Sequence, residues 1–214
     1  MTESRPALAD QKVACELFLR SQLPVGALGG VRLIEHGDES LLAPEEIGCL
    51  QSAVVSVRRA SGAGRDLARA LCRQLGVETK SIPRSRQRFP VWPRGVVGSI
   101  AHDGEFAAVV VASKCDVTAL GIDVEPAARL HTDVEHLIGT DTELTQFRDS
   151  NGGGTILFAL KEAVFKTVYP IDRIMLDFHD VTVCRESSTA LTRYGRVVHW
   201  RALTEPRVLA VAWL

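Results

Sequence analysis

Cysteine is scarce in this sequence, and the few cysteines form no recognisable site. There are five in 214 residues, an odd number, and no two of them form a CxxC pair. An odd, widely spaced set argues against both a disulfide framework and a zinc site. We therefore expect small, buried apolar side chains at these positions, which are Cys15, Cys49, Cys72, Cys115 and Cys184.

Long hydrophobic runs are also missing. No stretch approaches the roughly 18 apolar residues of a membrane helix, and residues 1–12 are polar, without the apolar core of a signal peptide. We therefore expect a cytoplasmic protein without a membrane partner. The composition, 46% hydrophobic and 24% charged, excludes disordered and collagen-like chains.

Net charge is nearly absent, because 25 Lys and Arg stand against 26 Asp and Glu. A general nucleic-acid binder usually has a basic excess, so we exclude nucleic acid as a partner. The near balance hides a sorting of sign along the chain. Residues 58–94 hold ten basic and two acidic residues, whereas residues 95–149 hold three basic and ten acidic ones. One block is suited to a polyanion and the next to a cation.

The apolar spacing predicts helices over residues 44–57, 65–75 and 156–169, with the last ending at Pro170. Residues 1–43 are ambiguous apart from one expected strand, residues 79–95 read as a proline-stiffened loop, and residues 150–154 read as a connector. Strands are predicted at residues 31–34, 105–112, 118–125, 181–184, 197–203 and 208–214. Helices and strands alternate irregularly, which favours an α+β fold over a parallel sheet.

The segment GIDVE ends one of the predicted strands with two acids. Alternation along a strand places Asp123 and Glu125 on one face, with Cα atoms about 6.6 to 6.8 Å apart. Two carboxylates this close repel each other unless a cation or a proton lies between them. Oxygen ligands favour Mg²⁺. The alternative is an exposed polar edge on an antiparallel strand.

The helix over residues 156–169 carries three further charged side chains of interest. Lys161 falls inside the apolar arc of the helix, where a lysine needs a buried anion or an exit to solvent. Glu162 and Lys166 lie on the border of that arc at i and i+4. The alternative for this pair is an exposed ion pair of little energetic weight.

A glycine-containing segment, GSIAHDG over residues 98–104, follows the basic loop, and we place His102 in a turn there. Glycines let the backbone approach a ligand, and His102 offers a donor to a phosphate. No GxxxxGK[ST] phosphate loop is present. The basic block offers further donors suited to phosphates, namely Arg58, Arg59, Arg65 and Arg88.

These motifs occur in a defined order: LAPEE (42–46), PVWPRGVVGSIAH (90–102), GIDVE (121–125), FALKEAVFK (158–166) and LDF (176–178). In order and spacing, residues 41–185 resemble the 4′-phosphopantetheinyl transferases of the Sfp and enterobactin synthetase component D type. The resemblance implies transfer of the phosphopantetheine arm of coenzyme A to a serine of an acyl or peptidyl carrier protein, with adenosine 3′,5′-bisphosphate leaving. It is compatible with siderophore, polyketide or nonribosomal peptide synthesis.

The resemblance also implies a fold of two similar halves, each a small antiparallel sheet with helices, related by a pseudo-two-fold axis with the ligand cleft between them. We place the division between residues 1–113, on the coenzyme A nucleotide side, and residues 114–214, with the metal carboxylates. Such a fold needs no partner subunit, so we expect a monomer.

By the same resemblance, Mg²⁺, or Mn²⁺ in its place, is held by Asp123, Glu125 and Glu162. Glu162 is the expected base for the serine proton, and Lys166 is expected to stabilise the leaving group. The residues expected at coenzyme A are one of Arg58 and Arg59, with Arg65, Arg88, the backbone of Ala101, His102, Asp123, Lys161 and Lys166.

Two alternative functions stay open, one because the sequence departs from the family pattern at Ala101 and one because other enzymes use the same metal-binding carboxylates. The family usually has Ser or Thr where Ala101 stands, which raises the hypothesis of a coenzyme A-binding protein without transfer activity. The same carboxylates could also serve a metal-dependent phosphohydrolase. The register of Arg84, Arg86 and Arg88 in the basic loop also stays open.

Overall fold

The computed structural model describes residues 7–150 and 152–214. Its first part contains α1 (Leu8–Gln22), β1 (Ala27–Leu33), η1 (Asp38–Leu41), α2 (Pro44–Ile47), η2 (Gly48–Leu50), α3 (Val55–Gln74), β2 (Val96–His102) and β3 (Phe106–Ser113). The three strands form an antiparallel sheet in the order β1-β3-β2, here called the N-terminal sheet.

The second part contains β4 (Leu120–Pro126), α4 (Thr132–Ile138), α5 (Asp141–Gln146), α6 (Gly153–Asp172), η3 (Phe178–Asp180), β5 (Val181–Cys184), β6 (Thr189–Thr192), β7 (Val197–Leu203) and β8 (Arg207–Trp213). Its five strands form a second antiparallel sheet in the order β4-β8-β7-β6-β5, here called the C-terminal sheet. The architecture is therefore α+β with two antiparallel sheets, as predicted.

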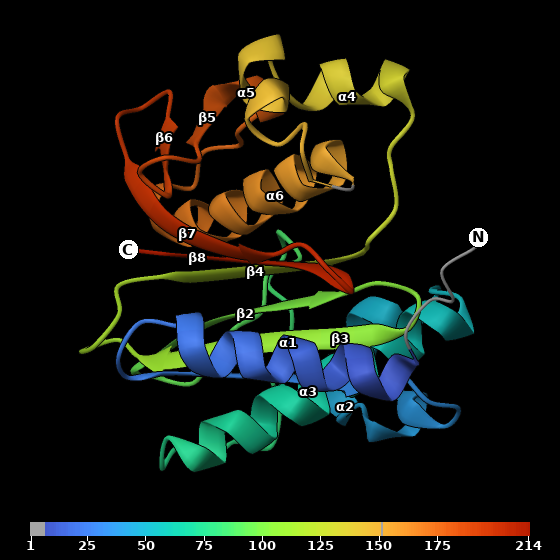
Figure 1. Cartoon of the computed structure of the whole chain (residues 1–214). Coiled ribbons are helices and arrows are strands. Elements are labelled where there is room, and N and C mark those ends of the chain that lie inside the picture. Colours follow the sequence, from blue (N-terminus) through green and yellow to red (C-terminus); the bar gives the residue numbers. More distant parts are fainter. Residues whose placement is uncertain (1–6, 151) are drawn as a thin grey trace.

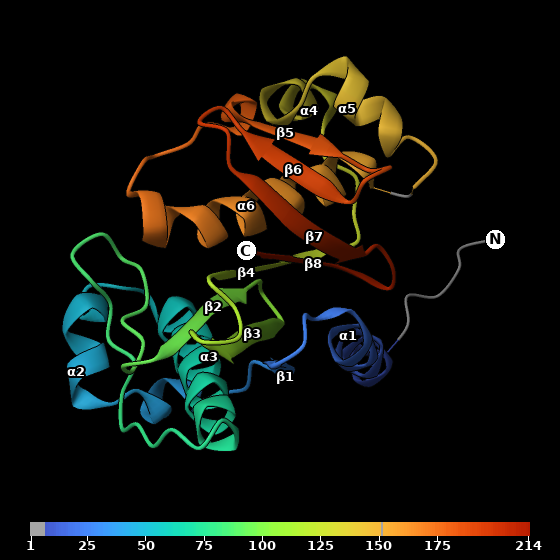
Figure 2. The same cartoon turned by 90° about the vertical axis from the view of Figure 1, so that its left-hand side faces the viewer.

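The two sheets lie against each other, with α3 on the outer face of one and α6 on the outer face of the other (Figure 1). Alternation along the strands divides the apolar side chains among three cores. Val109 packs toward α3, and Ala210 packs toward α6. Ile122 and Val110 meet in the core between the sheets, which α1 flanks (Figure 2). The edge strands β2 and β4 are thereby brought to one seam.

Gly121 determines how closely α6 approaches β4. A Cβ at this position would lie 2.5 Å from Thr167 Oγ1 and would collide with the carbonyl oxygen of Ala163. A residue with a side chain would force the helix away from the strand. This close approach places the middle of α6 directly over the polar face of β4.

The helix prediction near the N-terminus is wrong in its boundaries. The predicted helix over residues 44–57 breaks after η2, and the predicted helix over residues 65–75 is the second half of α3, which begins at Val55 and runs without interruption to Gln74. Glycines lower the helical propensity of that stretch. They are nevertheless needed there, because a Cβ at Gly62 would collide with the Asp38 carbonyl and one at Gly64 would lie 2.7 Å from Ile100 Cγ2.

Three other local predictions need correction. The described part of the ambiguous residues 1–43 supplies α1, β1 and η1, and His102 ends strand β2 instead of lying in a turn. Pro170 does not end α6, which continues to Asp172. Arg173 then adopts a left-handed conformation and donates its backbone N–H to the Tyr169 carbonyl oxygen, closing the last turn.

The cysteine prediction holds for Cys15 and Cys72, which are buried, and is wrong for Cys115 and Cys184, which are exposed. The side chain of Cys49 lies outside the described residues. Among the described residues, no helix is long and apolar enough to cross a membrane.

Candidate functional site

Asp123 occupies the face of β4 that meets α6. Its side chain is buried, and its Oδ1 accepts a hydrogen bond of 2.6 Å from Lys166 Nζ. Its Oδ2 is also buried and has no hydrogen-bond partner among the described residues. Burial raises the pKa of Asp123, and the ammonium of Lys166 opposes that rise. This unpartnered oxygen is therefore in an unfavourable position unless a cation or proton reaches it.

The carboxylates of Glu125 and Glu162 interact electrostatically with that of Asp123. Burial raises the pKa of Glu125 to about 7, and the negative charges of Asp123 and Glu162 add to the rise. The pKa of Glu162 is raised as well, first by burial and then by Asp123. All three predicted metal ligands thus share one electrostatic environment. Their oxygen-only donor set is the one that Mg²⁺ prefers.

The carboxylates do not form a ready-made cage. Within residues 7–150 and 152–214, no three His, Cys, Asp or Glu side chains converge closely enough to hold a metal ion. Lys166 instead supplies the positive charge at Asp123 Oδ1. The donor types and the unpartnered Asp123 Oδ2 fit a divalent cation. Binding one would require the two glutamates to move toward Asp123.

Glu125 predicts a pH dependence of stability. Its folded pKa of about 7 lies above its ordinary value of 4.5, so the folded metal-free protein should lose stability as pH rises from about 4.5 through 7. Glu125→Gln removes this loss and should stabilise the protein at pH 8 by on the order of 2 kcal/mol, allowing for partial exposure. At pH 4 the variant should match the parent. Thermal melts across this range with a chelator present test the prediction, and equal melting temperatures of the two proteins at pH 8 would contradict it.

His102 lies on the other side of the seam, at the end of β2. Partial withdrawal of its ring from water lowers its pKa, and the positive charges of Arg84, Lys166 and Arg65 lower it further. The histidine therefore stands between cations of the basic block and the lysine of α6. A group of cations that disfavours protonation of His102 is suited to an anionic ligand.

The arginines predicted to bind coenzyme A differ in their burial and in the groups they contact. Arg65 is buried on α3 and donates from Nε to the Ile82 carbonyl oxygen at 3.0 Å. Arg58 donates to the Ala53 carbonyl oxygen, and Arg59 pairs with Glu39 at 2.9 Å, both near the start of α3. The sequence leaves open the register of Arg84, Arg86 and Arg88 in the basic loop, residues 79–95. Of these three, Arg84 is close enough to His102 for its charge to lower the pKa of the ring.

The side chains of Ala101 and Lys161 are both buried. Ala101 is 4% exposed and packs in the core between the sheets. Lys161 is buried, with its Nζ 2.9 Å from Glu143 Oε1 and 2.9 Å from the Phe178 carbonyl oxygen. Of the two expectations for Lys161, a buried anion or an exit to solvent, the structure shows the buried anion, Glu143. These partners enclose the ammonium, so a contact with the diphosphate, which stays a prediction, would require Lys161 to leave Glu143.

Glu143 is a residue that the sequence analysis missed. It lies in α5 and also accepts from the backbone N–H groups of Thr140 and Val183. The T-x-x-E pattern of Thr140 and Glu143 is a capping signal that could have identified the helix. The pattern contains no information about Lys161.

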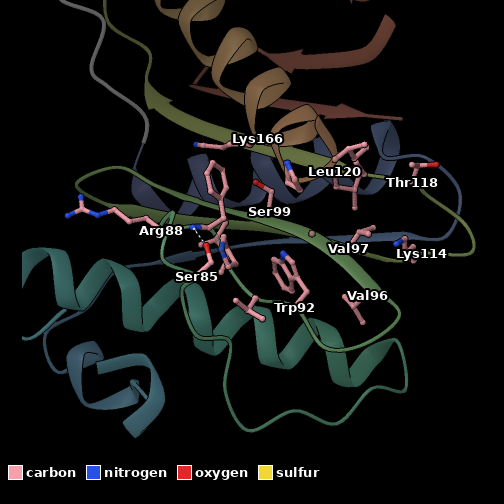
Figure 3. A pocket seen from close by; sticks show the side chains of 18 of the residues that line it. Ser85, Arg88, Trp92, Val96, Val97, Ser99, Lys114, Thr118, Leu120 and Lys166 are labelled. Atoms are coloured by element: carbon pink, nitrogen blue, oxygen red, sulfur yellow. Dashed lines mark hydrogen bonds between the residues drawn. The ribbon is translucent and has the colours of Figure 1, made fainter. Parts of the chain in front are cut away.

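A cavity of about 550 Å³ opens beside Lys166, between β2, the basic loop and the end of α6 (Figure 3). Its apolar wall includes Trp92 and Val97. None of the described residues that line it is an Asp or a Glu. Its basic side chains are Arg88, Lys114, Lys166 and Arg173. A planar apolar group that carries negative charge would suit this lining.

The basic loop is held across the seam by aromatic stacking. The ring of Phe89 lies 4.2 Å from that of Tyr169 on α6, with an interplanar angle of 14°. Phe165 packs against both rings. Figure 2 shows the loop after α3 rising to the end of α6. The stack therefore fixes the wall of the cavity that carries Arg88.

Comparisons with known proteins match both parts of the chain. A family described as "4′-phosphopantetheinyl transferase N-terminal domain" matches residues 44–112, and the "4′-phosphopantetheinyl transferase superfamily" matches residues 119–212. The 4′-phosphopantetheinyl transferase Npt of Nocardia iowensis is 29% identical over 172 residues, covering 79% of this chain and 77% of the relative.

Two further relatives show similar identity. The 4′-phosphopantetheinyl transferase Svp of Streptomyces mobaraensis is 35% identical over 147 residues, covering 66% of this chain and 60% of Svp. The 4′-phosphopantetheinyl transferase PptT of Mycobacterium tuberculosis is 32% identical over 160 residues, covering 72% of this chain and 70% of PptT.

Proposed function

Since the chain belongs to the 4′-phosphopantetheinyl transferase superfamily, we propose that it transfers the phosphopantetheine arm of coenzyme A to a serine of an acyl or peptidyl carrier protein with Mg²⁺. The serine oxygen forms a bond to phosphorus, the pyrophosphate P–O bond breaks, and adenosine 3′,5′-bisphosphate leaves. The observation that carries the proposal is the Lys166–Asp123 pair, which joins the carboxylate group to the basic cavity.

Coenzyme A is proposed to bind along the seam. The cations around His102 suit its phosphates, and the cavity beside Trp92 and Val97 suits its adenine. We assign Arg65, Arg84, Arg88 and His102 to coenzyme A. Arg58 and Arg59 lie nearer the start of α3 than Arg65 does, and we propose that Arg59 exchanges Glu39 for phosphate when the ligand binds. At Ala101 only the backbone is available to the ligand.

Mg²⁺ is proposed to be held by Asp123, Glu125 and Glu162, and Mn²⁺ has the same ligand preference. When bound, the cation would neutralise the charge on the pyrophosphate oxygens. The unpartnered Oδ2 of Asp123 and the raised pKa values of the two glutamates support this assignment.

Glu162 and Lys166 are proposed to handle the proton and the leaving group. Glu162 lies half-buried with a raised pKa, which suits a base that accepts the serine proton near neutral pH. Lys166 donates a hydrogen bond to Asp123 in this structure, and we propose that it donates to the departing phosphate oxygen during the reaction. One chain carries all of these residues, so we propose that the monomer is active.

We place the functional division between residues 113 and 114. Residues 1–113 supply the arginines and His102, and residues 114–214 supply the carboxylates, Lys166 and the cavity residues Lys114 and Arg173. The proposed site thus needs both parts of the chain.

The proposed function is tested by incubating the protein with coenzyme A, Mg²⁺ and a panel of apo acyl and peptidyl carrier proteins. We expect one serine of at least one carrier to gain the phosphopantetheine mass, and chelation of the cation to stop the reaction. Coenzyme A binding without modification of any carrier would favour a non-catalytic binder. Cleavage of coenzyme A without a carrier would favour a phosphohydrolase.

The cavity makes a prediction about coenzyme A affinity. Lys114→Glu reverses a charge at the cavity and should raise the KM for coenzyme A by about 3- to 10-fold with little change in kcat, because repulsion acts on bound substrate and transition state alike. Lys80→Glu is the matched control, since it makes the same charge change on an exposed lysine outside the cavity lining. Equal KM values for the two variants would contradict this placement of the nucleotide.

A further inference from the structure

Arg207 is a fully buried arginine at the first position of β8, far in sequence from the residues of the candidate site. Its guanidinium pairs with the carboxylates of Asp103 and Glu105. Its Nε donates to Gln11 Oε1 at 3.2 Å, and its guanidinium carbon lies 4.2 Å from the centroid of the Phe106 ring. One side chain therefore contacts α1, the β2–β3 turn and β3.

The contact with Asp103 reaches the candidate site through one peptide bond. Asp103 follows His102 directly, and its Oδ1 accepts from the backbone N–H groups of Glu105 at 2.7 Å and Phe106 at 2.8 Å. Its Oδ2 pairs with Arg207. One oxygen of Asp103 thus shapes the turn and the other ties it to the guanidinium, so the position of His102 depends on Arg207.

The backbone of Arg207 reaches the opposite side of the seam. In the β4–β8 ladder, Arg207 stands opposite Pro126, and the next residue, Val208, stands opposite Glu125. The backbone of Arg207 therefore pairs with the strand that carries Asp123 and Glu125, while its side chain holds the turn after His102.

We propose that Arg207 is a positioning residue that sets His102 relative to Asp123 and Glu125. This inference rests on the proposed function. An apolar cluster of similar volume could hold α1, β3 and β8 together equally well, because buried ion pairs add little to stability over such a replacement. The planar guanidinium adds direction: it binds two carboxylates in a fixed geometry that neither a lysine nor an apolar side chain reproduces.

The test removes the charges together, so that none is left buried and unpaired. In Arg207→Met/Asp103→Asn/Glu105→Gln, the asparagine can still accept the turn hydrogen bonds. We expect a melting temperature close to that of the parent and a KM for coenzyme A that is raised roughly 10- to 100-fold, because small misplacements of a binding group are costly. A purely structural brace predicts a lower melting temperature with an unchanged KM, which would overturn the proposal.

A matched control breaks a second arginine–carboxylate arrangement, which stays within the N-terminal part of the chain. Arg32 of β1 also bridges two carboxylates, those of Asp38 in η1 and Asp66 in α3. Arg32→Met/Asp38→Asn/Asp66→Asn should leave the KM for coenzyme A unchanged. If it raises the KM as much as the Arg207 triple variant does, the effect is a general one and the proposal fails.

A double-mutant cycle with His102→Ala tests whether Arg207 acts through His102. Combining it with the triple variant should weaken coenzyme A binding no more than His102→Ala alone, whereas additive losses would contradict the proposal. Should the triple variant not fold, Arg207→Lys, which keeps the charge but loses the fork, takes its place with the same expectations. Calorimetry measures the affinity of each variant for coenzyme A and does not require the transfer reaction. Failure of the proposed reaction is therefore distinguishable from failure of this inference.

Discussion

Replacing Glu162 with glutamine is expected to lower kcat by about 10²- to 10⁴-fold, the usual contribution of a general base. The side chain keeps its shape but can no longer accept the serine proton, and it becomes a poorer cation ligand. Because burial and Asp123 raise the pKa of Glu162, its charged form is disfavoured in the folded protein. Glu162→Gln should therefore leave the melting temperature unchanged or slightly raised.

This expectation is checked by the rate of carrier modification at saturating coenzyme A and Mg²⁺, together with a thermal melt. The matched control is Glu78→Gln, which makes the same change on an exposed glutamate outside the candidate site. A kcat for Glu162→Gln close to that of the control would remove Glu162 from the proposed mechanism. A loss of activity together with a large fall in melting temperature would assign Glu162 a structural role instead.

Breaking the buried Lys161–Glu143 pair should have the largest effect on stability. Glu143→Gln leaves the ammonium of Lys161 buried without its counter-charge, and removal of one partner of such a pair typically costs about 3–5 kcal/mol. For a chain of this size, that corresponds to a fall in melting temperature of roughly 6–20 °C. The double variant Lys161→Met/Glu143→Gln should recover most of the loss, since no unpaired charge remains.

The double variant also decides what Lys161 does. The geometry makes Lys161 an internal counter-ion that joins α6 to α5 and to the Phe178 carbonyl oxygen. We therefore expect the KM for coenzyme A to stay near that of the parent in Lys161→Met/Glu143→Gln. A large rise in KM in this folded variant would show instead that Lys161 contacts the diphosphate. Thermal melts and steady-state kinetics on the same preparations separate the two outcomes.

Local periodicity explains which parts of the candidate site could be predicted. Asp123 and Glu125 are two positions apart on one strand, so alternation places them on one face without any knowledge of the fold. Glu162 and Lys166 are four apart on a helix, and Lys161 falls among its apolar residues for the same reason. The structure agrees, with Lys161 buried and Glu162 and Lys166 half-buried.

Contacts between distant segments explain what was missed. The predicted helices leave out residues 58–64, and only the packing of Asp38 against Gly62 shows why α3 needs a glycine there. Glu143 reads as part of a helix cap until Val183 and Lys161 converge on it. The strand β2 looked like a glycine-rich turn, because its pairing with β3 is what makes it a strand. In each case the deciding partner is remote in the chain.

The sequence by itself determined the family, the α+β class and the residue types that we propose for the chemistry, because motifs and periodic patterns are local properties of the chain. Only the tertiary structure decided that Lys166 reaches Asp123, that Lys161 faces Glu143 and that Arg207 ties the turn after His102 to β8. The physical reason is that burial and charge pairing depend on which side chains share a low-dielectric space. That depends on the packing of the two sheets, which no local pattern contains.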